Sequence, residues 1–108
     1  MIYHITTSAA WEAASGSGVY AGDSLASEGF IHCSTADQVA GVANAIFRGV
    51  EGLVVLHIEE TRLASPVKYE NLEGGEELFP HVYGPINVDA VAQVTRLAAG
   101  PNGEFAFG

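Results

Sequence analysis

The feature that most constrains the fold is the run LVVLHI, residues 53–58, in which His57 alone interrupts a series of apolar side chains. The run is far too short to span a lipid bilayer. Strands that are covered on both faces show continuous apolar runs of this kind, whereas half-exposed strands alternate apolar and polar residues. The run therefore predicts a central strand, with His57 as a structural side chain within it.

The segments around this run predict further strands and two main helices. Strands are expected over residues 2–6, 30–33, 67–70, 81–83 and 92–97. A helix over residues 9–14 is expected to follow a cap at Thr7 or Ser8. Residues 19–29 are expected to be irregular, with a helical turn around Leu25 as the one regular feature considered.

The second helix is predicted by an apolar stripe with helical spacing. The stripe consists of Val39, Val42, Ala43, Ile46 and Phe47. Ser34 or Thr35 is expected to cap the helix, and Asp37 or Gln38 to complete a capping box. Gly49 is expected to follow its C-terminus.

The balance of elements indicates an α+β fold with a mixed or mostly antiparallel sheet, because strands outnumber helices and the helices gather in the N-terminal half. A length of 108 residues suits a single domain. We expect its core to span residues 2–97. Residues 98–108 are expected to form a loosely packed tail, which Phe105 and Phe107 could anchor.

The charge balance excludes several classes of partner. Thirteen acidic and four basic side chains give a net charge of −9, which repels phosphate backbones and anionic membranes. The first residues lack the charged and apolar regions of a signal peptide, so we expect a soluble cytoplasmic protein without nucleic-acid or membrane partners. A single cysteine excludes an internal disulfide, and the four histidines lack metal-ligand spacing, so no metal site is predicted.

The segment GFIHCSTADQV, residues 29–39, contains the first candidate site. Successive strand residues point to opposite faces, so His32 and Cys33 cannot form a dyad, and Cys33 is expected to be buried and inert. His32 and Ser34 share the other face, close to the expected helix start at Thr35. Free N–H groups at a helix start favour an anionic ligand. The alternative is a capping serine beside a hydrogen-bonded histidine.

Further candidates come from FPHVYGPI, residues 79–86, and from two single residues. His81 and Tyr83 share a face if the segment is extended, and prolines on both sides would hold their rings in place. The alternative is a tight turn packed with aromatic residues. His4 in the first strand is either a ligand or a core residue with a main-chain partner. Glu70 is either a site carboxylate or a solvated side chain.

Taken together, several segments resemble the bacterial "domain of unknown function 952" family over residues 2–97. They are IYHITT, WEAA, SEGFIHCSTADQV, the VKYE before the acidic loop, and FPHVYGPI. That family is grouped by fold with the ADP-ribosyltransferase superfamily, which includes the RNA 2′-phosphotransferases and binds NAD in a cleft between two small sheets. The resemblance implies a split, mostly antiparallel sheet with helices packed outside.

The resemblance also implies roles for the candidate residues. His4 would take the place of the first-strand residue that contacts the NAD ribose or phosphate. His32, Ser34 and Thr35 would shape the cleft, and His81 and Tyr83 would form a wall for nicotinamide. The last strand has no glutamate, so Glu70 is the substitute for the carboxylate that stabilises an oxocarbenium-like state. The scarcity of cationic residues weakens the case for an RNA substrate.

Three hypotheses follow from the sequence. In the first, the cleft binds a nucleotide-like ligand such as NAD, used as a substrate, with Glu70 and His32 as catalytic candidates and no other cofactor. In the second, the protein is a non-catalytic module that binds a small molecule or a protein and keeps only the fold. In the third, the same histidines hold a metal ion in a hydrolase.

Overall fold

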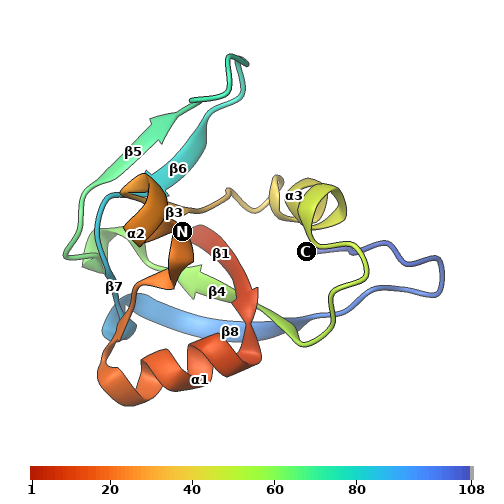
Figure 1. Cartoon of the computed structure of the whole chain (residues 1–108), viewed down its shortest axis with the longest axis horizontal. Coiled ribbons are helices and arrows are strands. Elements are labelled where there is room, and N and C mark those ends of the chain that lie inside the picture. Colours follow the sequence, from red (N-terminus) through yellow and green to blue (C-terminus); the bar gives the residue numbers. More distant parts are fainter. Residues whose placement is uncertain (108) are drawn as a thin grey trace.

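The computed structural model describes residues 1–107, which form three small antiparallel sheets and three α-helices (Figure 1). The first sheet has the order β1-β4-β8, formed by Ile2–Thr7, Leu53–Ile58 and Val91–Leu97. The second pairs β2 (Val19–Tyr20) with β7 (Ile86–Asn87). The third has the order β3-β6-β5, formed by Ile31–His32, Phe79–Val82 and Val67–Glu70.

The helices are α1 (Ser8–Ser17), α2 (Gly22–Glu28) and α3 (Val39–Ile46). Short 3₁₀ turns span Glu60–Arg62 and Val88–Ala90. The predicted α+β class with antiparallel pairing is confirmed. The number of helices differs from the prediction, because at most a helical turn was expected where α2 lies.

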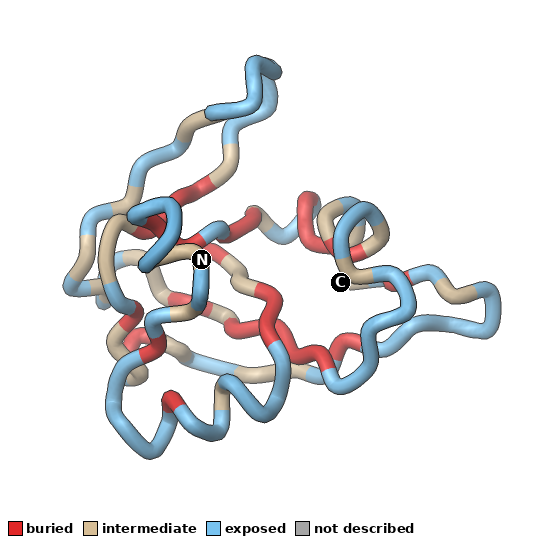
Figure 2. The backbone as a smooth tube through the Cα atoms, in the orientation of Figure 1, coloured by how far each residue is buried: buried red, intermediate tan, exposed pale blue. Residues whose placement is uncertain are grey.

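Strand β4 is the centre of the first sheet, as its apolar run predicts. It pairs antiparallel with β1 on one side and with β8 on the other, and five of its six residues are buried. Figure 2 shows this buried stretch running through the middle of the molecule. Its alternating side chains enter two hydrophobic clusters, one containing Leu56 and the other Val55.

Helix α1 has the predicted cap at its start but ends later than predicted. The Thr7 hydroxyl accepts a hydrogen bond from the N–H of Ala10 at 3.1 Å. At the other end, Gly18 adopts φ 90° and its N–H binds the Ala14 carbonyl, a left-handed cap that glycine adopts without strain. The helix continues through Gly16, three residues beyond the predicted end at Ala14.

Residues 19–29 are more regular than predicted, because the helical turn considered around Leu25 is a full helix and a strand precedes it. This segment contains β2 and the seven-residue helix α2. Strand β2 pairs with β7, more than sixty residues later in the chain, with Val19 opposite Asn87. A two-residue strand has no periodicity of its own, so the pattern of the local sequence could not reveal it.

The predicted start of α3 is also wrong. The helix begins at Val39, and neither Ser34 nor Thr35 caps it. Instead, the N–H of Thr35 donates to Oε1 of Gln38 at 3.0 Å, and the Thr35 hydroxyl donates to Asp37 at 2.5 Å. These bonds close a local turn before the helix, so the Thr35 N–H is not free to bind an anion.

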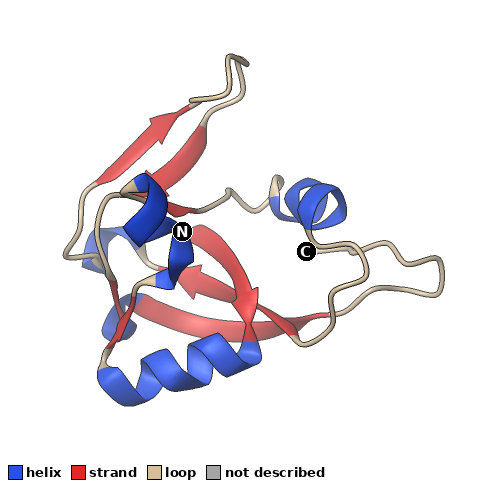
Figure 3. Ribbon diagram, in the orientation of Figure 1, coloured by secondary structure: helices blue, strands red, loops and turns tan. Residues whose placement is uncertain are grey.

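The segment after β3 joins the first and third sheets. Tyr3 and Ser34 exchange two main-chain hydrogen bonds of 2.8 and 2.7 Å. The N–H of Cys33 binds the Pro80 carbonyl at 3.0 Å. Residues 31–34 therefore connect β1 to β6, and the hairpin β5-β6 projects from this junction (Figure 3).

The last described residues pack against α3. Phe105 is buried, and the Asn44 side chain binds both its N–H, at 2.8 Å, and its carbonyl, at 3.0 Å. The ring of Phe107 contacts Tyr3 and His57. Gly108, the final residue of the expected tail, lies outside the described residues.

Candidate functional site

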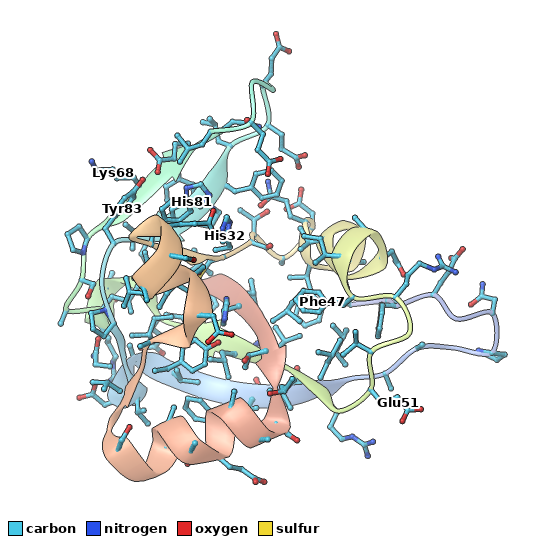
Figure 4. The ribbon with its side chains drawn as sticks, in the orientation of Figure 1. His32, Phe47, Glu51, Lys68, His81 and Tyr83 are labelled. Atoms are coloured by element: carbon cyan, nitrogen blue, oxygen red, sulfur yellow. The ribbon has the colours of Figure 1, made fainter. Side chains whose placement is uncertain are left out.

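The candidate site is a cleft of about 790 Å³ between the third sheet and α3. Five of the residues predicted from the sequence line it: His4, His32, Ser34, Glu70 and His81. They come from β1, β3, β5, β6 and the chain after β3, so the fold gathers them from distant parts of the sequence. Thr35 and Tyr83 are not among the lining residues. Figure 4 shows His32 and His81 close together, with Phe47 facing them from the end of α3.

One wall of the cleft is organised by Glu70. Its Oε1 atom accepts hydrogen bonds from Nδ1 of His81, at 3.0 Å, and from the Tyr83 hydroxyl. The bond from Tyr83 and then that from His81 hold the pKa of Glu70 below its ordinary value. The same bond raises the pKa of Tyr83. Glu70 therefore presents a fixed negative charge at neutral pH.

His81 is the buried member of this wall. Only 5% of it is exposed, and the Phe30 ring stacks on its imidazole with centroids 4.3 Å apart. In the tautomer whose Nδ1–H donates to Glu70, Nε2 carries the lone pair of the ring. Among residues 1–107, Nε2 has no hydrogen-bond partner, and it is not sealed from solvent. The His81 residue itself lines the cleft.

His32 lies at the mouth of the cleft. It is exposed, and its Nε2 lies 3.0 Å from a carboxylate oxygen of Glu28. Its ring packs edge-on against Phe30 at 4.8 Å and against His81 at 5.3 Å. Sequence reasoning missed Glu28 as a lining residue. Glu28 is the last residue of α2 and His32 lies in β3. Because the two residues are not on one helix, their spacing of four residues did not predict that they are neighbours.

His4 lies behind this wall in a chain of hydrogen bonds. Its Nδ1 lies 2.5 Å from the carbonyl of His32, and its Nε2 lies 2.9 Å from the Tyr20 hydroxyl. Burial lowers the pKa of His4 to about 4, although the bond to the His32 carbonyl opposes this change. The neutral ring therefore donates from Nδ1 and accepts at Nε2 from Tyr20, whose oxygen also lies 2.9 Å from the Thr6 hydroxyl.

Cys33 is buried, as predicted, with 3% of its surface exposed. It packs with Ile31 in the first hydrophobic cluster, and burial raises the pKa of its thiol. The thiolate is the reactive form of cysteine, so the structure gives this residue no nucleophilic role.

We expect Cys33 to react with a disulfide reagent such as Ellman's reagent on the order of 100-fold more slowly in the folded protein than in urea. Burial restricts access and suppresses the thiolate, and both effects vanish on unfolding. Absorbance at pH 8 measures the two rates. Equal rates in the two samples would contradict the burial of this side chain.

Across residues 1–107, no three His, Cys, Asp or Glu side chains come together in a way that could hold a metal ion. The described chain also contains no helix with the length and apolar character that a membrane crossing requires.

Comparison with known proteins identifies the family of this chain. The family described as "Protein of unknown function (DUF952)" matches residues 5–94. The chain belongs to the DUF952 family. The resemblance found in the sequence motifs is thereby confirmed at the level of this family.

Two solved structures share the fold of this DUF952 protein. The crystal structure of protein CC0527 from Caulobacter crescentus is 35% identical, with a TM-score of 0.86, and covers 97% of this chain and 92% of its own. The solution NMR structure of CC0527 is 36% identical, with a TM-score of 0.83, and covers 95% and 89% of the two chains. No curated protein matches the DUF952 chain.

Proposed function

We propose that the cleft binds a small molecule with a flat, positively charged ring, and that the nicotinamide end of NAD is the specific candidate. One observation carries this proposal: Glu70 is held ionised in the wall of a cleft lined by Phe30, Phe47 and Phe79. Aromatic faces and a nearby carboxylate both attract a flat cation. The volume of about 790 Å³ is typical of small-molecule sites.

The proposal includes a reaction, suggested by the resemblance to the ADP-ribosyltransferase superfamily. The bond between nicotinamide and the ribose would break, and nicotinamide would leave as a neutral ring with the bonding electron pair. Glu70 would stabilise the positive charge that develops on the ribose. His32, exposed at the mouth, would contact a ribose hydroxyl, and water or another nucleophile would capture the ribose.

A non-catalytic binding module is the second candidate, and a specific observation favours it. Glu28, Glu70 and Glu73 line the cleft, but no lysine or arginine does. The diphosphate of NAD would therefore find no cationic partner among the lining residues. This protein would then bind a ring compound without turning it over.

We expect Glu70→Gln to weaken binding of NAD and nicotinamide riboside by about tenfold, because the amide removes the charge that attracts the ring. Isothermal titration calorimetry measures both affinities. Glu12→Gln is the matched control, because Glu12 is exposed on α1 and does not line the cleft. Chromatography of released nicotinamide separates the catalytic candidate from the binding module. Absence of any binding or thermal shift at millimolar ligand refutes the proposal.

A further inference from the structure

We infer that the cleft selects organic cations whose charged head donates hydrogen bonds, namely an amidinium or guanidinium attached to a flat apolar body. The inference rests on the proposed function, because it assumes that the cleft binds a small molecule. It goes further by naming the chemical class of the ligand from the groups that the walls present.

The lining of the cleft is negatively charged. Three carboxylates, those of Glu28, Glu70 and Glu73, line the cleft without any lysine or arginine. Both hydrogen bonds to Glu70 go to Oε1, so in the described chain Oε2 has no protein partner. A carboxylate binds a planar amidinium or guanidinium through paired N–H groups, a geometry that also fixes the orientation of the ligand.

One nitrogen of His81 is unpaired in the described chain. This histidine lines the cleft and is nineteen-twentieths buried, and its Nε2 is not sealed from solvent and lacks a partner among residues 1–107. In the tautomer whose Nδ1–H donates to Glu70, Nε2 carries the lone pair and accepts a hydrogen bond. A ligand that satisfies it must carry a donor. An anionic head group would bring its own lone pairs next to the lone pair on Nε2, and the two would repel each other.

Two side-chain donor groups at the same walls already donate to main-chain carbonyls. The Ser24 hydroxyl donates to the Phe30 carbonyl at 2.8 Å, and the Asn71 amide donates to the Glu77 carbonyl at 2.7 Å. The Ser34 hydroxyl remains able to donate or accept. Helix α3 contributes Val42 and Ile46 to the lining, so it faces the cleft with its side and not with its N-terminus. The walls therefore present mainly acceptors.

The apolar part of the ligand has its own partners. Phe30 stacks on His81 and approaches Tyr83 at 5.3 Å, so a flat body beside Glu70 would meet aromatic surface. Leu72, on the hairpin loop, and Ile46, on α3, line the cleft and are 61% and 70% exposed. When a ligand binds, these two apolar side chains would contact the ligand instead of water.

The test uses three compounds of nearly equal shape, namely benzamidinium, benzamide and benzoate, and measures their affinities by calorimetry. We expect benzamidinium to bind at least about tenfold more tightly than benzamide, and benzoate to bind most weakly. Glu70→Gln should remove the preference for benzamidinium over benzamide. Glu12→Gln, outside the cleft, should leave all affinities unchanged. If Glu70→Gln fails to fold, Glu28→Gln serves in its place, with an expected loss for benzamidinium of about threefold.

The outcomes separate this inference from the proposed function. The cation selectivity is overturned if benzamide or benzoate binds as tightly as benzamidinium or more tightly. It is also overturned if the affinity for benzamidinium is unchanged in every folded variant of a cleft glutamate. Either result still leaves a cleft that binds small molecules. Binding of NAD without binding of benzamidinium overturns the cation selectivity as well. If none of these compounds and no nicotinamide riboside binds, the proposed function itself fails.

Discussion

Lowering the pH from 7 to 5 is expected to reduce the free energy of unfolding by about 2 kcal/mol through His4 alone. Burial lowers the pKa of His4 from 6.5 to about 4 in the folded protein. Between these values the unfolded chain binds a proton that the folded chain does not. The stabilisation is therefore complete above pH 6.5 and is lost as the pH falls toward 4. Urea unfolding at several pH values measures it.

Two variants isolate the contribution of His4. The glutamine in His4→Gln can still donate to the His32 carbonyl but does not titrate. The free energy of unfolding of this variant should therefore fall by about 2 kcal/mol less than that of the wild type between pH 7 and pH 5. Tyr20→Phe removes the bond to Nε2 but leaves the imidazole buried. It should be less stable at every pH and keep the pH dependence. Identical pH profiles for wild type and His4→Gln would show that His4 is not the source.

Replacement of Leu56 by alanine is expected to lower the free energy of unfolding by about 3 kcal/mol. Leu56 has no exposed surface and lies in β4, between β1 and β8. Shortening it removes apolar contacts from the first hydrophobic cluster and leaves a cavity that paired strands on both sides prevent from closing. Urea denaturation monitored by circular dichroism measures the loss.

Ile46→Ala is the matched control for this experiment. Ile46 is also a large aliphatic residue, but 70% of it is exposed on α3. Its replacement should change the free energy of unfolding by no more than about 0.5 kcal/mol. A Leu56→Ala protein as stable as Ile46→Ala would mean that β4 is not the packed centre of the fold.

The elements with strong local signals could be predicted from the sequence. The run LVVLHI identified β4, and the Thr7 cap identified the start of α1, because each signal depends only on neighbouring residues. The strand β2 and the start of α3 were missed. Pairing with Ile86–Asn87 creates β2, and a turn closed by Gln38 delays α3 to Val39, although Thr35 is a good capping residue by composition.

Five residues that line the cleft were named from the sequence, but Glu28 was missed, Thr35 and Tyr83 do not line the cleft, and the hydrogen bonds of the site could not be predicted. Alternation along strands correctly separated His32 from Cys33, and it placed His81 and Tyr83 on one face, where both bind Glu70. The bond between His4 and the His32 carbonyl joins residues 28 positions apart, and no sequence pattern marks it. The unpaired Nε2 of His81 also depends on which nitrogen Glu70 engages, which only the folded arrangement determines.

The attachment of Phe105 to Asn44 bears on where this domain ends. The family match stops at residue 94, inside β8, yet the second hydrophobic cluster includes Leu97 and Phe105. A chain cut at the family boundary would lose both side chains and leave the Asn44 amide without its main-chain partners. Because α3 supplies one wall of the cleft, a shortened protein would be a poor sample for ligand screening. Expression for such screens should extend through Phe107.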